Sequence, residues 1–358
     1  MSKARELANL RGTPTDSNIL LQSTAGDAIT GGSGTCNIAM GLNAFGAATT
    51  GDDNIAIGRL AIGTGVTTGT GNIGLGISAL SALIGGTNNI GMGLTAADAV
   101  TTGTDNIAIG RLAFSASTDG ADNIAIGRSA LAVSGNDGDD NIAIGLSALG
   151  TGDVSGNENV AIGSSALTAL TTGTNNIAIG ENAACLVTGA SHSIIMGACA
   201  GDAITGDYNL AMGRNAMGAA TSGSVNIALG LCVMSSGVTT GADNIALAQK
   251  ALNALTSGVN NIALGTTSMD ALTTGNNNVA IGEDALGAST TGCYSVAIGS
   301  VALGGADTTG IDNIAIGRNS MDALTSGICN VAIGKDALGA STTGCLNIAM
   351  GQGAMGFS

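Results

Sequence analysis

The sequence predicts an all-β fold, a β-solenoid (β-roll) of about 19–20 coils with a 17-residue repeat. Three observations predict it. A five-residue phrase, Asn-Ile-Ala-Ile-Gly or a close variant, starts nineteen times between Asn37 and Asn347, at a mean interval of 17.2 residues. The apolar runs within each interval last only a few residues between glycines, which is too short for helices. Stacked short units are the architecture that such a period indicates.

The composition excludes several other classes of protein. Of the 358 residues, 60 are Gly, one is Pro and five are aromatic, and no apolar run approaches the length of a membrane helix. Glycine is too sparse for collagen, and charged residues, at 10%, are too few for a coiled coil or a disordered chain. The net charge of −15 repels phosphates and anionic lipids. We therefore expect no nucleic-acid partner and no membrane insertion.

The chain begins with a segment that lacks the repeat. Residues 1–17 are interpreted as an N-terminal attachment arm, a short helix or extended segment that ends near Pro14, and residues 18–358 as the repeat domain. The arm has charge where a secretion signal would have an apolar run. The residues expected to attach the chain to another protein are Lys3, Arg5, Leu7 and Leu10. A degenerate first coil is expected at Asn18.

Each coil has the same pattern when its phrase Asn is numbered position 0. Positions 1 and 3 are Ile, Val, Leu or Met, positions 7 and 8 are usually Ala and an aliphatic residue, and a Gly lies three residues before the Asn in 18 of 19 copies. Two short strands per coil, separated by bends at glycines, are the expected structure. The recurring Gly indicates a positive φ or a close approach of two backbones.

The two sides of the first strand differ in kind. Position 2 is Ala or Gly in 18 of 19 copies, with Ile195 the exception. Our hypothesis is that positions 1, 3 and 8 fill the core of one chain, while the Asn and Ala side meets the same side of neighbouring chains in a homotrimeric rod. The alternative is that the small position 2 lets two walls of one narrow solenoid approach each other, without a partner.

The repeated Asn side chains are expected to stack as a structural ladder of hydrogen-bonded amides, which needs no ligand. The members chosen to represent this ladder are Asn54, Asn106, Asn123, Asn176, Asn261 and Asn313.

Basic residues also follow the repeat. Six occupy position 5, and four of these have an Asp six residues earlier. The expected result is a set of salt bridges that set register, within a chain or across an assembly, although exposed pairs contribute only about 0–1 kcal/mol each. A column that binds carbohydrate is the alternative. The pairs are Asp53 with Arg59, Asp105 with Arg111, Asp122 with Arg128, and Asp312 with Arg318.

No pattern of catalytic or cofactor-binding residues is found. Seven scattered Cys without a C-x-x-C pair and a single His, His192, favour neither a disulfide framework nor a zinc site. Acidic bends such as 51–53 and 136–140 raise the alternative of calcium, but the G-G-x-G-x-D repeat is missing. We therefore expect no cofactor and no enzymatic activity. Thr-Thr pairs in nine coils raise ice binding as an alternative function of the chain.

Segments such as 169–183, ALTTGTNNIAIGENA, resemble the N-x-A-[VI]-G-x-x-A-L…T-T-G repeats of bacteriophage tail fibres and related virion proteins. More distantly, they are similar to the β-roll heads of trimeric autotransporter adhesins. The resemblance covers about residues 18–358, and the first ten residues are similar to the starts of fibre-like proteins of phages that infect marine cyanobacteria. It implies a trimeric, elongated and surface-displayed protein.

The resemblance and the repeat together lead to an expected function. The chain is expected to be a structural fibre protein of a phage virion that serves host attachment. Its expected partners are further copies of itself, other virion or fibre proteins at both ends, and a host surface glycan. A bacterial surface adhesin or extracellular filament subunit is the alternative. We prefer the virion because the stalk, anchor and signal of an autotransporter are not found in the sequence.

Overall fold

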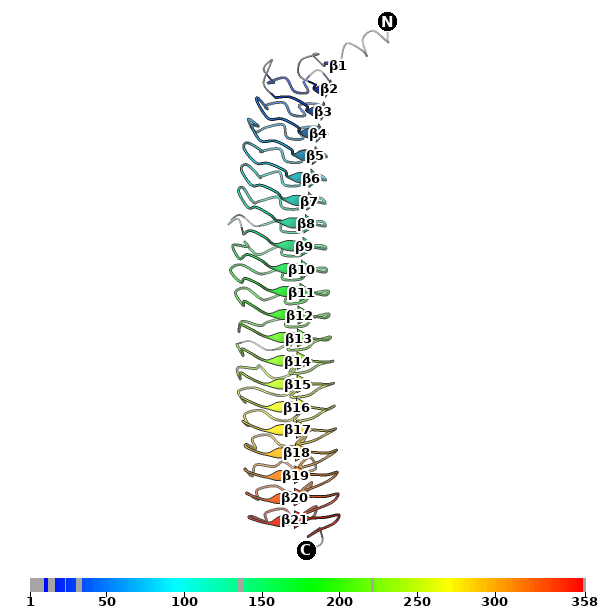
Figure 1. The fold of residues 1–358 in the computed structure, drawn as a ribbon, viewed down its shortest axis with the longest axis vertical. Coiled ribbons are helices and arrows are strands. Elements are labelled where there is room, and N and C mark those ends of the chain that lie inside the picture. Colours follow the sequence, from blue (N-terminus) through cyan, green and yellow to red (C-terminus); the bar gives the residue numbers. More distant parts are fainter. Residues whose placement is uncertain are drawn as a thin grey trace. The chain divides into compact units, whose positions relative to one another are not determined.

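The computed structural model describes residues 10–11, 17–22, 24–29, 34–133, 135, 138–219 and 222–356. The fold is a parallel β-solenoid of about 19 turns with a repeat of about 17 residues, and the chain divides into two units, Met1–Asn175 and Asn176–Ser358. Each unit consists of consecutive coils, and each coil contributes one short strand, as Figure 1 shows.

The strands of the first unit are β1 (Leu10–Arg11), β2 (Ile19–Leu21), β3 (Ile38–Met40), β4 (Ile55–Ile57), β5 (Ile73–Leu75), β6 (Ile90–Met92), β7 (Ile107–Ile109), β8 (Ile124–Ile126), β9 (Ile142–Ile144) and β10 (Val160–Ile162). The strands of the second unit are β11 (Ile177–Ile179), β12 (Ile194–Met196), β13 (Leu210–Met212), β14 (Ile227–Leu229), β15 (Ile245–Leu247), β16 (Ile262–Leu264), β17 (Val279–Ile281), β18 (Val296–Ile298), β19 (Ile314–Ile316), β20 (Val331–Ile333) and β21 (Ile348–Met350).

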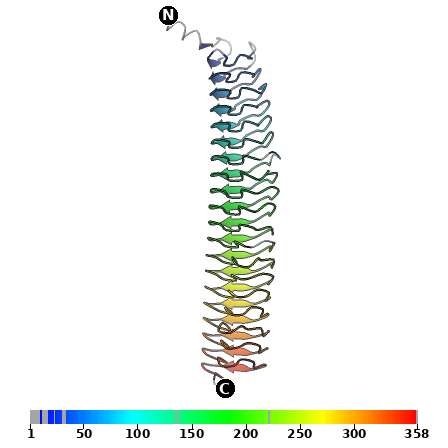
Figure 2. The same ribbon diagram turned by 180° about the vertical axis from the view of Figure 1, so that it is seen from behind.

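From β2 onward, consecutive strands within each unit pair in parallel, so that equal positions of the repeat lie one above another (Figure 2). Between β4 and β5, for example, Ile55 pairs with Ile73 and Ala56 with Gly74. The backbone ladder extends beyond the strands: the Ile55 N–H donates to the Asn72 carbonyl at 2.8 Å, and the Ile62 N–H donates to the Ala79 carbonyl at 2.9 Å. Nearly the whole coil is therefore hydrogen-bonded to its neighbours.

The expectation of two strands per coil is wrong for the described residues, because the run at positions 7 and 8 is a turn. Positions 6 and 8 have left-handed backbones, as in Leu60 (φ 60°) and Ile62 (φ 45°). This alternation curls the chain, so the run cannot extend as a strand. The side chain at position 8 is nevertheless buried, and Ile62 is fully enclosed.

Two recurring glycines are required by the close spacing of coils. At position 4, Gly110 has φ +136°, and a Cβ there would lie 2.5 Å from the Gly127 carbonyl oxygen of the next coil. Three residues before the Asn, a Cβ on Gly138 would lie 2.6 Å from the Gly156 carbonyl oxygen. Both distances are far inside van der Waals contact, so the predicted close approach of backbones is present at these turns.

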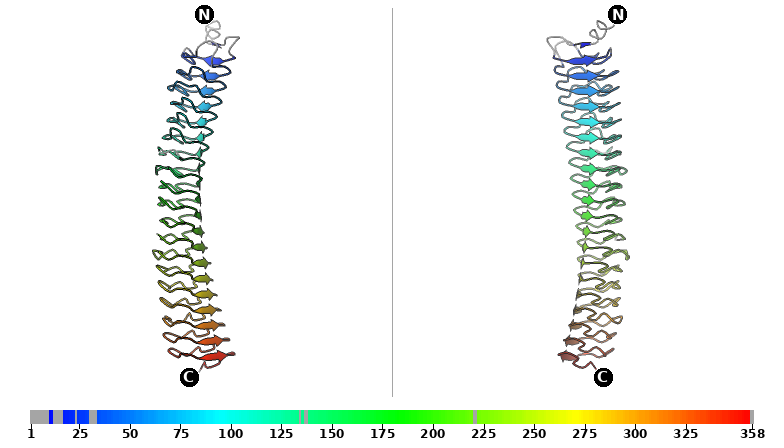
Figure 3. Two further views of the ribbon diagram at one scale, coloured as in Figure 1. Left: turned by 60° about the vertical axis from the view of Figure 1, so that its left-hand side comes forward. Right: turned by 90° about the vertical axis from the view of Figure 1, so that its right-hand side faces the viewer.

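The direction of the strand side chains is opposite to our hypothesis. Position 2 points inward, as in the fully buried Ala56, and the Asn at position 0 is also buried, whereas positions 1 and 3 point outward. One part of the alternative interpretation is therefore confirmed: the small position 2 lets the two walls of the coil approach. The presence or absence of a partner stays a prediction. Where Gly91 replaces Ala, a Cβ would lie 2.9 Å from Leu80 Cγ of the opposite wall. In Figure 3 the strands of each unit line one side and the turns lie behind them.

The start of the first unit differs from the other coils. The degenerate copy at Asn18 forms a coil, because β2 pairs in parallel with β3, and the Asn37 N–H donates to Asn18 Oδ1 at 2.7 Å. Leu10 lies in β1, which pairs with β2 in the antiparallel direction. The predicted attachment residues Lys3, Arg5 and Leu7 lie outside the described residues.

Candidate functional site

The outward side chains of the strands form a continuous apolar surface on each unit. We define the apolar face as the first and third residues of β3–β10 in the first unit and of β11–β21 in the second. Ile57 is 38% exposed and Ile109 is 37% exposed, although strands on both sides flank each of them. The neighbouring Ala56 and Ala108 are fully buried. A regular, exposed column of large aliphatic side chains of this kind marks an interaction surface.

The Asn ladder lies directly behind the apolar face and fixes the height of each strand. Asn54 shows the pattern: its N–H and its Nδ2 donate to Asn37 Oδ1 at 2.9 and 3.2 Å, and its Nδ2 also donates to the Gly69 carbonyl at 3.0 Å. The ladder satisfies buried backbone groups at every turn, as buried polar groups require. The same kind of bonding occurs at Asn106, Asn123, Asn176, Asn261 and Asn313.

Two serines interrupt the ladder in the second unit. Ser193 accepts the Asn209 N–H at 3.2 Å and Ser295 accepts the Asn313 N–H at 3.4 Å, so the hydroxyl replaces only part of the amide. The Ser193 N–H still donates to Asn176 Oδ1 at 3.1 Å. The serine hydroxyl therefore still accepts the N–H of the next coil, but it lacks the donors that the Asn amide gives to the preceding Asn oxygen and to the Gly carbonyl 14–15 residues later.

Charged side chains lie at the two ends of the strands, on either side of the apolar face. The acidic edge of the first unit consists of Asp53, Asp105, Asp122, Asp140 and Glu158 at position −1, and the basic edge consists of Arg59, Arg111 and Arg128 at position 5. All eight are exposed. In the second unit Asp312 and Arg318 occupy the same positions and are also exposed.

The predicted pairs form no ion pair within the chain among the residues that the structure describes. Position −1 precedes the strand and position 5 follows it, so an extended path of about 20 Å separates them. A salt bridge does join Lys335 Nζ to Asp336 Oδ2 at 3.3 Å, between positions 5 and 6. Pairing across an assembly stays a prediction.

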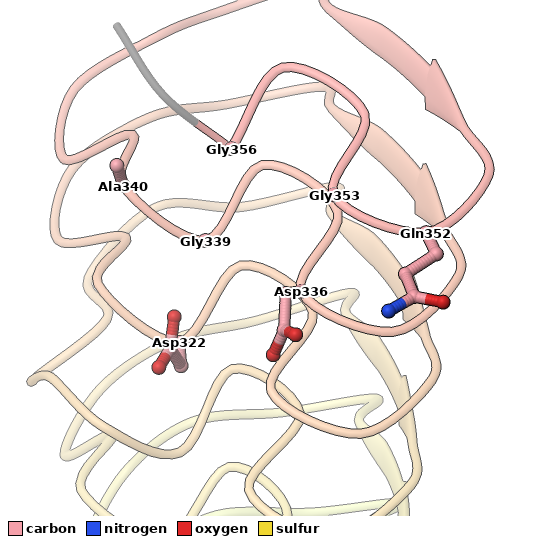
Figure 4. A pocket seen from close by; sticks show the side chains of 7 residues that line it. All are labelled: Asp322, Asp336, Gly339, Ala340, Gln352, Gly353 and Gly356. Carbon is pink, nitrogen blue, oxygen red and sulfur yellow. The ribbon is translucent and has the colours of Figure 1, made fainter.

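Partly buried carboxylates lie at position 9, away from the apolar face. Burial raises the pKa of Asp322, and the neighbouring Asp336 carboxylate adds to the rise. Figure 4 shows these two side chains from consecutive coils, beside a hollow of about 720 Å³ that Gln352, Gly353 and Gly356 also line. Asp270 and Asp284 repeat this relationship in the same unit, and burial likewise raises the pKa of Asp270. The sequence analysis missed these pairs, although the M-D-A-L and D-A-L-G phrases that contain them recur.

The acidic residues that the structure describes are not gathered into a metal site. Among the described residues, no group of three or more His, Cys, Asp or Glu side chains is placed to hold a metal ion. In the bend at 51–53, Asp52 Oδ1 accepts the Thr35 N–H at 2.6 Å and the Thr35 hydroxyl at 3.0 Å. This carboxylate therefore serves the adjoining coil. Asn136 and Asp137 of the other proposed calcium bend lie outside the described residues.

The cysteines are free thiols. Cys185 Sγ donates to Asp202 Oδ1 at 2.8 Å, and burial together with this carboxylate raises the pKa of Cys185 to about 12. A thiol in this state is a poor nucleophile at neutral pH.

The single histidine belongs to an exposed stack. The His192 and Tyr208 rings, both at position −1 of consecutive coils, lie 4.9 Å apart and within 4° of parallel. Their spacing equals that of the coils, so the stack follows the ladder geometry and has no second His beside it.

Some of the threonines that suggested ice binding donate hydrogen bonds within the solenoid. Thr101 Oγ1 donates to the Thr118 carbonyl at 3.0 Å, and Thr273 Oγ1 donates to the Thr290 carbonyl at 3.0 Å. These hydroxyls stabilise the contact between consecutive coils instead of forming a free array.

Comparison with known proteins finds no matching family model, no matching curated sequence and no matching solved structure. Within the described part of the chain, no helix has the length and hydropathy of a membrane span.

Proposed function

We propose that this chain is a self-associating structural protein, and that it forms part of a phage virion fibre serving host attachment. The observation that carries the proposal is the apolar face. Every described coil from β3 onward presents two large aliphatic side chains outward, at one register, on a backbone that is already hydrogen-bonded to the neighbouring coils. Such a surface has no function within the chain and gains free energy only when another surface covers it.

The homotrimer that we propose uses the Ile side of the strand for contacts between copies, whereas the sequence analysis expected the Asn and Ala side. The Asn and Ala positions are enclosed within each chain, whereas Ile55 and Ile57 face outward with the equivalent residues of neighbouring coils. A flat surface that repeats every coil matches a second copy of itself better than a globular partner of irregular shape. Covering one fully exposed aliphatic side chain contributes about 1.5–3 kcal/mol, so many partly exposed ones amount to a stable contact.

The assignment to a virion is supported by the resemblance of the repeated phrase to tail-fibre repeats. A repeat whose buried side is used for stacking suits a protein with a structural function. Bacterial adhesins use similar repeats, so the location of the protein distinguishes the virion fibre from the adhesin.

Two measurements test the proposal. Light scattering coupled to gel filtration is expected to give three times the chain mass, and a monomer would contradict self-association. Mass spectrometry of purified virions from the host that carries this gene is expected to detect the chain. Its recovery from the bacterial envelope alone would instead support the adhesin alternative.

A further inference from the structure

We propose that copies of this chain assemble parallel and in register, with the acidic edge of one copy paired to the basic edge of its neighbour at the same coil. This inference rests on the proposed self-association and goes on to specify its geometry and contacts. It places Asp53, Asp105 and Asp122 of each copy against Arg59, Arg111 and Arg128 of the next.

The first step is that the two edges carry opposite charge but do not neutralise each other within the chain. In three coils of the first unit an exposed Asp precedes the strand and an exposed Arg follows it, and no ion pair joins them among the described residues. The apolar face separates the two by the length of the strand. The partners of both edges are therefore to be sought on another surface.

The second step concerns the symmetry that satisfies both edges at once. When copies are arranged around an axis parallel to the direction of stacking, the end of one copy's strand lies beside the start of its neighbour's strand. The contact is then heterologous and closes into a ring, and each Asp edge meets an Arg edge. The apolar faces turn toward the axis and cover one another.

The third step fixes the axial position. In register, all three pairs of the first unit form. A shift by one coil places Leu42 or Ile77 opposite Asp53, in place of Arg59. Two Asp–Arg pairs then form in one direction, Asp122 with Arg111 and Asp140 with Arg128, and one forms in the other, Asp105 with Arg128, so the in-register arrangement has the most pairs. Because the apolar face is nearly identical from coil to coil, it cannot fix the axial register of one copy relative to its neighbour. The charged edges supply that selection, as polar contacts commonly do in repetitive interfaces.

The size of the surface is sufficient for a stable assembly. A strand segment of about 20 Å and a coil spacing of about 4.8 Å give roughly 100 Å² for each coil. The eight coils from β3 to β10 then offer roughly 800 Å², which equals the about 800 Å² that each partner contributes to a typical stable interface. A saccharide between the edges would instead meet only Ile, Val, Leu and Met, which lack hydrogen-bonding groups.

Cysteine cross-linking tests the register directly. In a chain whose seven native Cys are replaced by Ser, we would introduce Asp53→Cys together with Arg59→Cys and oxidise with oxidised glutathione, which is reduced as each disulfide forms. We expect covalent dimers and higher closed forms that disappear on reduction. The matched control, Asp53→Cys with Arg111→Cys, places the two thiols three coils apart and is expected to remain uncross-linked. Equal cross-linking of both variants, or none in a folded protein, would overturn the proposal.

A charge swap in the otherwise native chain gives an independent readout. Asp122→Arg alone and Arg128→Asp alone are each expected to weaken self-association by about tenfold, because like charges meet at every contact of the ring. The double variant restores opposite charges between neighbours and is expected to return to the native affinity. Failure of this rescue would overturn the proposal even if the cysteine-free chain does not fold.

These outcomes are separable from those of the proposed function. A monomer in light scattering contradicts self-association as a whole. An oligomer in which the control pair cross-links contradicts only the register. Neither result depends on whether the protein is found in virions.

Discussion

The side-chain oxygen of Asn261 accepts two hydrogen bonds from Asn278, one from its N–H at 3.1 Å and one from its Nδ2 at 3.0 Å. The Nδ2 of Asn261 meanwhile donates to Asn244 Oδ1 at 3.1 Å and to the Gly275 carbonyl at 2.8 Å. One buried amide thus connects three consecutive coils.

Asn261→Ala is expected to destabilise the second unit by about 3 kcal/mol, because it leaves the buried Asn278 N–H and Gly275 carbonyl without partners. Asn261→Ser is expected to cost about half as much, since Ser occupies the same position at 193 and 295 and accepts the next N–H there. Urea unfolding and hydrogen exchange of β16 and β17 measure both. Equal stability of the Ala and native chains would contradict a structural role for the ladder.

Ala248 is the one non-glycine at position 4 among the nineteen phrase-bearing coils, and its φ is +95°. Because L-residues are strained in this region, Ala248→Gly is expected to stabilise the second unit by about 1 kcal/mol. The matched control is Ala246→Gly, two residues earlier, which removes a buried methyl group and is expected to destabilise by about 1 kcal/mol. Thermal unfolding with hydrogen exchange of Ile245–Leu247 distinguishes the two. A loss of stability in the first variant would show that this turn is not strained.

Asp98 is expected to make the stability of the first unit depend on pH. Burial raises its pKa, and its Oδ1 is enclosed without a hydrogen-bond partner. The native state therefore binds this proton more tightly than the unfolded state, so the contribution of Asp98 to stability improves as the pH falls through the raised native pKa. The coils on either side carry Ser81 and Ser115 at this position.

Asp98→Ser is accordingly expected to stabilise the first unit at pH 7 by less than about 1 kcal/mol, since solvent screens a partly exposed group. The gain is expected to shrink as the pH falls below the raised native pKa of Asp98, and to vanish below the ordinary Asp pKa of 3.8, where both the native and the unfolded states are protonated. Unfolding midpoints at several pH values measure this. A gain that is constant with pH would indicate a packing effect instead of a charge effect.

Thiol reactivity distinguishes Cys185 from the exposed cysteines. With its pKa raised to about 12 by burial and by Asp202, Cys185 is expected to resist alkylation by iodoacetamide at pH 8 in the folded protein. Cys36, Cys329 and Cys345 are exposed and serve as internal controls in the same digest. Asp202→Asn removes the carboxylate and is expected to increase the labelling of Cys185. Rapid labelling of Cys185 in the native chain would contradict this environment.

The repeat is the part of the fold that the sequence predicts most clearly, because nineteen phrases at one period indicate a stack of equivalent coils. The direction of the strand was misjudged because Ile and Val at alternate positions usually face a core. The signal that was available is the restriction of position 2 to Ala or Gly in 18 of 19 copies, which fits the narrow interior of one coil.

The turn at positions 6–8 was not predictable from composition. Leu and Ile at positive φ, as at Leu60 and Ile62, are rare in proteins, and here the hydrogen bonds to neighbouring coils hold them in place. The candidate site was found in part. The Asp and Arg columns were recognised by spacing, but the distance between their members depends on which parts of the coil are extended.

The most direct test of the account is a density map of the purified protein at a resolution that separates strands. We expect parallel strands about 4.8 Å apart, one for every 17 residues, with the Ile side chains of each strand facing outward and the Asn and Ala side chains enclosed. A map in which the Asn-Ile-Ala-Ile-Gly phrases form helices, or in which Ile55 and Ile57 are buried within their own coil, would contradict it.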